Sequence, residues 1–256
     1  MRRLNNSHRI ITKVAEVNFN TKARALLTLF FSLVILSFQS AAKNDNENTN
    51  MVELRIGEAA DKFSQRYPSL ASVDHQPAGL SFYKASWGTH SKGRVKIAHA
   101  VHSFELPDVL NVMGTEGASS KQKGIFIVSI HSGISCANDI MHKDALDRFY
   151  NLLRTIQSSG WRSSIPLGLP RLNGKDMFIY YLESKDPTTL DADYKLSLQE
   201  WMNLDDLTNW EFYADGVFMR VTFMRDQSKM DPEAGLVRYQ SYSQKRGGVL
   251  FRFRRP

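Results

Sequence analysis

The chain has 256 residues, a formal net charge of +7 and a single cysteine, Cys136. One cysteine excludes an internal disulfide, and a chain of this length buries enough apolar surface to fold without one. Residues 1–42 hold six basic residues and one acidic residue, which is +5 of the total and leaves +2 for the rest of the chain. That nearly neutral remainder argues against a nucleic-acid-binding protein.

The first segment in chain order is an apolar run at residues 25–38, which follows a basic stretch and precedes the small residues Ser40, Ala41 and Ala42. A secretory signal peptide has an apolar region of about 7–15 residues, whereas a membrane-spanning helix needs about 20. We therefore predict a signal peptide over residues 1–42 that is cleaved on export to the periplasm. The alternative is an uncleaved helix that anchors the protein in the inner membrane.

Residues 43–50 are polar and offer no apolar side chain to anchor them, so they predict a flexible linker. Residues 51–256 are predicted to form a single domain. The alternative is a division into two subdomains near residues 163–173, a loop that contains two prolines and a glycine.

The first part of the domain is predicted to consist mostly of strands. Apolar side chains at helical spacing indicate a short helix at residues 56–67, which Pro68 ends. Leu106 and Pro107 are expected to end a strand, and the polar residues 114–124 to form a loop. Strand patterns occupy residues 80–87, 94–104 and 124–130. The last of these is continuously apolar, as in a central strand covered on both faces.

An apolar stripe in the next segment predicts the longest helix. The stripe comprises Ala145, Leu146, Phe149, Leu152, Leu153 and Ile156. We expect Asp139 to cap the N-terminus of this helix and Asp144 to form an ion pair with Arg148. Gly160 provides the left-handed residue that ends many helices, and Trp161 is expected to pack back on the last turn.

The C-terminal part is predicted to hold two short helices and a hairpin. One helix is expected at residues 175–182, and a capping box at residues 197–200 begins another. Asp215 and Gly216 favour the tight turn of a hairpin. Strands are expected at residues 210–213, 217–225, 236–243 and 249–254. Because strands occur both in hairpins and between helices, the predicted fold class is α+β, with a mostly antiparallel sheet and helices packed on one side.

The sequence lacks the common nucleophile-elbow, zinc-protease, P-loop, dinucleotide-binding and paired-cysteine motifs. His99 and His102 would point to opposite faces of a predicted strand, so we predict no metal ion there and no cofactor. His131, Ser132 and Cys136 lie between the predicted central strand and the longest helix, where active sites often form in open α/β sheets. They are the candidate catalytic residues. The alternative is a histidine and a cysteine with structural roles only.

Aromatic residues gather around the predicted hairpin, and arginines gather at the C-terminal end of the chain. The aromatic residues either pack in the core or form an exposed patch for a protein partner. The arginines either protect an edge strand from aggregation or attract an acidic partner or anionic lipid head groups. The candidate binding residues are Trp210, Tyr213, Phe218, Arg252 and Arg254.

Three short segments carry a resemblance to a known class of proteins. They are VHSFELP at residues 101–107, YNLL at residues 150–153 and SGW at residues 159–161. With them the chain resembles uncharacterised exported proteins of Gram-negative bacteria, of the kind that includes immunity proteins against type VI lipase effectors. The resemblance implies a periplasmic protein that binds a toxin, and it assigns no binding residues.

Together these features predict a non-catalytic periplasmic protein that binds another protein, in the manner of an immunity protein that neutralises a secreted toxin effector. One alternative is a cell-envelope hydrolase that uses residues 131–136. The other is a peripheral envelope protein whose C-terminal arginines contact an anionic membrane surface.

Overall fold

The computed structural model describes residues 50–87, 91–135, 140–184, 189–231, 236–238 and 248–255. The predicted signal peptide, nearly all of the predicted linker and Cys136 therefore lie outside the described residues. Among the described residues, no helix is long and apolar enough to cross a membrane.

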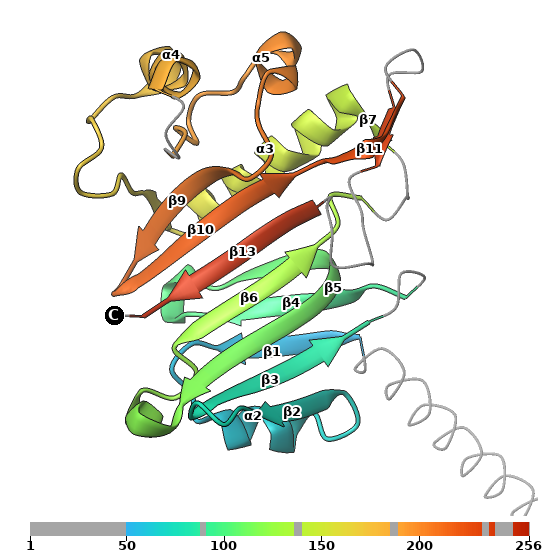
Figure 1. Ribbon diagram of the computed structural model, residues 1–256, viewed down its shortest axis with the longest axis vertical. Helices are drawn as coiled ribbons and strands as arrows, with labels where there is room; N and C mark the ends of the chain where they lie inside the picture. The colour runs from blue at the N-terminus through green and yellow to red at the C-terminus, as the bar shows by residue number, and fades with distance from the viewer. Residues whose placement is uncertain are drawn as a thin grey trace, which may run out of the picture. The chain divides into compact units, whose positions relative to one another are not determined.

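The strands form a ten-stranded mixed sheet and a separate three-stranded sheet within these ranges (Figure 1). The first half of the chain contains β1 (Met51–Arg55), α2 (Ala60–Arg66), β2 (Ala71–His75), β3 (Leu80–Ser86), β4 (Gly93–Ala98), η1 (Ala100–His102), β5 (Phe104–Gly117), η2 (Ala118–Lys123) and β6 (Ile127–Ser132). The second half contains β7 (Ile140–Met141), α3 (His142–Ser158), β8 (Arg162–Ser163), α4 (Gly174–Ser184), α5 (Leu198–Met202), β9 (Thr208–Ala214), β10 (Val217–Met224), β11 (Asp226–Asp231), β12 (Leu236–Arg238) and β13 (Gly248–Arg254).

The main path through the large sheet is β1-β4-β5-β6-β13-β10-β9-β8, and β3 pairs with both β5 and β2. Only the β1–β4 pairing among these strands is parallel. The predicted α+β class with a mostly antiparallel sheet is thus confirmed.

Strand β5 is long because it pairs with two strands along one edge. Its first half pairs with β4 and its second half with β3, while β6 pairs with the opposite edge. Asp108 has a φ of +55°, and the register with β6 shifts between Val109 and Asn111, so the strand bends here. The expectation that Pro107 ends a strand is wrong, because a proline is tolerated beside such a bulge.

The predicted strand at residues 94–104 is also shorter in the structure. Strand β4 ends at Ala98, and the 3₁₀ turn η1 leads into β5. The expected loop at residues 114–124 is instead the end of β5 followed by η2. At residues 94–104 the side-chain alternation continues across a backbone irregularity that residue types alone do not reveal, whereas residues 114–117 are polar and still pair with β3.

Helix α3 covers one face of the sheet through an aromatic cluster. The ring centroid of Phe149 lies 4.6 Å from that of Trp210 on β9, 5.4 Å from that of Trp201 on α5 and 5.6 Å from that of Phe223 on β10. All four side chains are at most 1% exposed. Figure 1 shows α3 behind β9 and β10, so this is the packed face of the sheet.

The prediction for the glycine at the C-terminal end of α3 agrees with the structure, whereas the ion pair expected in the N-terminal half of the helix does not form between the described side chains. The helix begins at His142 after Met141, and Asp139 lies outside the described residues. No ion pair joins Asp144 and Arg148 among the described side chains, so that expectation is wrong. The prediction for Gly160 is confirmed: it has a φ of +84°, its N–H bonds to the Gln157 carbonyl at 2.8 Å and the Trp161 N–H bonds to the Ile156 carbonyl at 3.4 Å. The ring of Trp161 contacts Phe104 and Phe253.

Two further local predictions in the C-terminal half are confirmed. Ser197 and Glu200 form a capping box at the start of α5. Asp215 and Gly216 both have positive φ, of +39° and +79°, in the turn between β9 and β10.

Candidate functional site

The candidate catalytic residues His131 and Ser132 do not meet. As neighbours on β6 they project to opposite faces of the sheet. The Nδ1 of His131 lies 2.9 Å from Oδ1 of Asn111, whereas the Ser132 hydroxyl donates to the Pro107 carbonyl at 2.7 Å. Burial lowers the pKa of His131. The two side chains therefore form no nucleophile–base pair, and Cys136 lies outside the described residues.

His99 and His102 form part of a structural junction, although they do not lie on one strand as expected. The Nε2 of His99 is 3.0 Å from the Ala214 carbonyl, and the Nδ1 of His102 is 3.0 Å from the Ser159 carbonyl. The Nε2 of His102 also lies 3.2 Å from a carboxylate oxygen of Asp215. These contacts join the end of α3 to the β9–β10 turn. No group of three or more potential metal-ligating residues occurs among the described residues.

Trp210 does not belong to an exposed binding patch, so this part of the prediction is wrong. Its side chain is 0% exposed and packs on Phe149. Along β9 the even-numbered residues point into the core and the odd-numbered residues point away from it. An aromatic residue at an inward position belongs to the core even when its neighbours in sequence are exposed.

The other four candidate binding residues share the opposite face of the sheet, which we call the open face. In the strand register, Tyr213 of β9 lies opposite Phe218 of β10, and Phe218 lies opposite Arg254 of β13. Residues directly opposite each other project to the same side of a sheet. The rings of Tyr213 and Phe218 are 5.0 Å apart, and Arg252 precedes Arg254 by two positions on the same face.

A groove of about 750 Å³ lies on this face, and we call it the basic groove. Strands β6, β13, β10 and β9 contribute its floor, and the loop at residues 164–167 lines it beyond β8. The side chains that line it include Ile127, Ile165, Leu167, Glu211, Phe218, Arg220, Arg252 and Arg254. In Figure 1 no helix crosses the front of β6, β13 and β10.

The charge of the basic groove comes from three arginines and one glutamate. Arg220 is held by Glu211, with its Nε 2.8 Å and its Nη2 2.5 Å from Oε1 of the carboxylate. Arg252 and Arg254 are both exposed, and neither has an ion-pair partner among the described residues. The groove therefore presents two unpaired cations beside one neutralised pair.

Apolar side chains lie next to these cations. Leu167 is 96% exposed and Phe218 is 43% exposed. The loop that carries Leu167 is tied down, because Arg171 donates to the carbonyls of Ile165 and Pro166 at 2.6 Å and 3.3 Å. An exposed apolar side chain on an ordered loop beside arginines is typical of a protein-binding surface.

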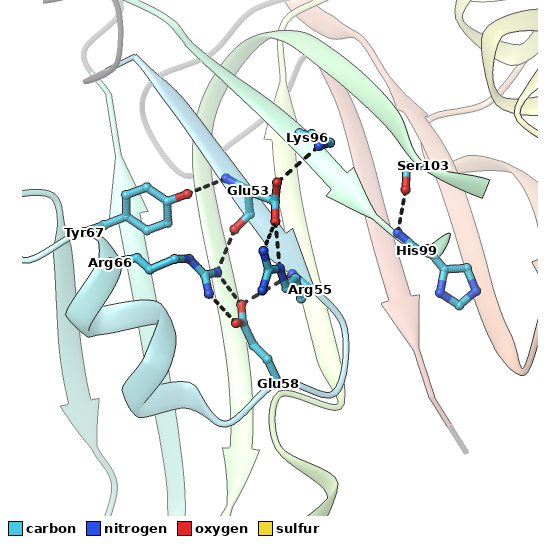
Figure 2. Close-up of polar contacts among 8 residues, drawn as sticks. All are labelled: Glu53, Arg55, Glu58, Arg66, Tyr67, Lys96, His99 and Ser103. Atoms are coloured by element: carbon cyan, nitrogen blue, oxygen red, sulfur yellow. Dashed lines mark hydrogen bonds and ion pairs between the residues drawn. The ribbon is translucent and has the colours of Figure 1, made fainter. Parts of the chain in front are cut away.

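The sheet edge at β1 is closed by polar side chains from α2 and its flanking turns (Figure 2). The Glu53 N–H donates to the hydroxyl of Tyr67 at 2.7 Å, and Arg66 donates to the Glu53 carbonyl at 3.1 Å. Arg66 is held in turn by Glu58 at 2.6 Å and 2.7 Å, and this ion pair raises the pKa of the guanidinium. A partner strand therefore cannot add to this part of β1 without displacing the cluster.

At the opposite end of the sheet, the outer side of β9 is occupied as well. Beyond β8, the Ser164 N–H donates to the Glu211 carbonyl at 2.8 Å, and the Glu211 N–H donates to the Thr189 hydroxyl at 2.9 Å. The Leu190 N–H donates to the Asn209 carbonyl at 2.8 Å. With the outer side of β9 occupied, the open face offers more accessible contacts than this edge does.

Sequence reasoning identified Phe218, Arg252 and Arg254 but missed Arg220 and Leu167. Arg220 follows from strand alternation once Phe218 is placed outward. No sequence signal could have placed Leu167, because its position depends on how the loop after β8 folds over the sheet. Comparisons with protein-family models, with curated proteins and with solved structures gave no match to this chain.

Proposed function

We propose that this protein acts by binding another protein through the basic groove. The observation that supports this most directly is the pair of exposed arginines, Arg252 and Arg254, which have no ion-pair partner in the described part of the chain and lie next to the exposed apolar side chains of Phe218 and Leu167. Arginine and aromatic side chains contribute most of the binding energy in many protein interfaces. Unpaired cations on a surface also accelerate association with an acidic partner.

The setting that we propose is the periplasm, with the protein serving as an immunity protein that neutralises a secreted toxin effector. The signal-peptide pattern in residues 1–42 and the resemblance over residues 101–161 support this setting. An immunity protein needs a rigid complementary surface and no chemistry of its own. The closely packed aromatic cluster on the other face of the same strands supplies that rigidity.

A typical stable interface buries about 800 Å² on each partner. The basic groove is then the centre of the contact surface, and the rim extends over neighbouring parts of the open face. A flat anionic membrane is the competing target for the arginines, since each basic residue near such a surface contributes about 1 kcal/mol to the free energy of membrane binding. A membrane, however, leaves the concave part of the groove unfilled.

The experiment is affinity capture from periplasmic extract with the tagged full-length chain. The wild type is compared with Arg252→Glu/Arg254→Glu and with Lys62→Glu/Lys143→Glu, which makes the same charge change at exposed positions on α2 and α3. We expect one partner in about equimolar amount, retained by the lysine variant and lost by the arginine variant. The purified pair should then bind more weakly as salt is raised.

Two results would contradict the proposal. One is the absence of any stoichiometric partner, and the other is equal capture by the wild type and the arginine variant. A parallel sedimentation assay with vesicles of phosphatidylcholine and phosphatidylserine separates the membrane alternative. Vesicle binding that requires Arg252 and Arg254, without a protein partner, would assign the groove to a membrane surface.

A further inference from the structure

We propose that the basic groove recognises an extended acidic segment in which two carboxylates occupy alternate residues and apolar side chains lie beside them on the same face. This inference rests on the proposed function and specifies the chemistry of the partner. It follows from the spacing of the cations, from the position of the apolar side chains and from the one acidic residue of the groove.

The spacing of the cations comes from the geometry of β13. Arg252 and Arg254 are two positions apart on one strand, so their Cα atoms are about 6.6–6.8 Å apart and their side chains leave the same face. Each guanidinium can bind a carboxylate through two parallel hydrogen bonds. Two acidic residues at alternate positions of an extended chain have the same repeat, whereas adjacent acidic residues point to opposite sides.

The apolar positions flank these cations. In the strand register, Arg254 lies between Phe218 on β10 and Ile127 on β6. Ile165 and Leu167 line the same groove from the loop beyond β8. A bound carboxylate is therefore close to apolar surface, and apolar side chains on the same segment would cover Phe218 and Leu167 from water.

Glu211 sets the boundary of the acidic site. It neutralises Arg220, which lies directly opposite Arg252 in the register. A carboxylate that approached Glu211 would meet its negative charge, and Arg220, the groove arginine beside it, is already engaged by Glu211. The acidic side chains of the partner therefore lie over β13, and the apolar side chains that flank them along the segment lie beyond the arginines, near Phe218 and the loop.

The volume of the basic groove is consistent with binding of a short extended segment. About 750 Å³ accommodates several side chains of a segment and is too small for a folded domain. The partner accordingly inserts a protruding strand or loop, and the rest of its surface contacts the rim.

The test uses fluorescein-labelled peptides and the full-length chain in anisotropy titrations. The probe has the core LSESESL, which presents the same groups in either direction. One comparison peptide has the same composition with adjacent glutamates, LSEESSL, and a second replaces both leucines by serine. We expect the adjacent isomer and the serine peptide each to bind at least about fivefold more weakly than the probe.

On the protein side, Arg252→Glu/Arg254→Glu should weaken the probe by at least about tenfold. Leu167→Ser should weaken it severalfold without affecting the serine peptide, and Lys62→Glu/Lys143→Glu should leave it unchanged. As a control, a cooperative thermal melting transition of each variant would show that it is folded. Equal binding of the two glutamate isomers, or probe binding that survives the arginine reversal, would overturn the inference.

These failures are distinguishable from failure of the proposed function. A captured partner that requires Arg252 and Arg254 while no peptide binds would leave protein binding intact and contradict the segment chemistry. Absence of any partner together with absence of peptide binding would contradict both. Binding only to anionic vesicles would assign the arginines to lipid and overturn the segment as well.

Discussion

The two faces of strands β9, β10 and β13 have the same backbone and opposite properties. On the packed face, Val221, Phe223 and Phe251 are at most 1% exposed beneath α3 and α5. On the open face, Phe218 is 43% exposed next to the exposed Arg254. Residue type alone therefore does not assign a side chain to a face of the sheet. Phe218 and Phe223 differ only because one has an odd and the other an even position on β10.

The largest effect is expected on the packed face. Phe149→Ala removes the ring that joins Trp201, Trp210 and Phe223, and should lower the free energy of unfolding by about 3–5 kcal/mol. Urea denaturation of the full chain measures this. The matched substitution on the open face, Phe218→Ala, should change stability by no more than about 0.5 kcal/mol. Similar losses for both variants would remove the distinction between the two faces.

A second comparison concerns two glycines with positive φ. In Gly160→Ala the new Cβ would lie 2.5 Å from Nδ1 of His102, whereas in Gly168→Ala it would meet nothing within 4 Å. We expect Gly160→Ala to cost about 2–3 kcal/mol and Gly168→Ala about 1 kcal/mol, the latter from backbone strain alone. The shift of the denaturation midpoint of each variant relative to the wild type would measure these losses. A smaller loss for Gly160→Ala would mean that the junction of α3 with His102 is not tightly packed.

We expect the stability of the folded protein to decrease at acidic pH. Burial lowers the pKa of His131, and burial together with Arg225 lowers the pKa of His142, both from an ordinary 6.5. Below about pH 6.5 the unfolded chain therefore binds more protons than the folded protein. The contribution of the two histidines to stability is fully present above about pH 6.5 and is lost as the pH falls through their folded pKa values. Melting temperatures between about pH 8 and pH 5 should show this decline.

His131→Gln provides the control for that decline, because it removes one of the two titrating groups and keeps an amide hydrogen-bond donor toward Asn111. The variant should be less sensitive to pH in the same range. An unchanged pH dependence would show that His131 does not contribute to it.

A small stability effect is expected at the ion pair of the open face. Glu211→Gln should change the free energy of unfolding by no more than about 1 kcal/mol, because surface ion pairs contribute little. It also releases Arg220 as a third free cation. Affinity for the acidic probe should therefore rise severalfold at low salt, and the rise should disappear in Glu211→Gln/Arg220→Gln. Unchanged affinity would show that Arg220 remains out of reach.

Much of the local structure could be predicted because it depends on a few neighbouring residues. Gly160 and Trp161 end α3, Ser197 and Glu200 start α5, and Asp215 starts the turn of the hairpin, all as expected. Errors occurred where a distant segment decides the outcome. The bend of β5 after Pro107 depends on pairing with three other strands, which local propensity does not contain.

The candidate site was predictable only in part. Phe218, Arg252 and Arg254 were identified as an aromatic and basic set, but Trp210 was grouped with them because it is close in sequence. Whether a strand position faces the core depends on which side α3 packs against. The candidate catalytic residues His131 and Ser132 form no pair for a related geometric reason, since adjacent strand residues point apart.

The sequence by itself determined the α+β class, the capping box of α5, the glycine end of α3 and the hairpin turn, because these arise from backbone preferences and hydrogen bonds within a few residues. Only the tertiary structure decided which side of the hairpin is core and which is open. It also brought Leu167 and Arg254 to one groove, although they are far apart in the chain. The physical reason is that strand register and helix packing are cooperative, long-range choices, in which burial of the aromatic cluster selects one face and leaves the arginines on the other.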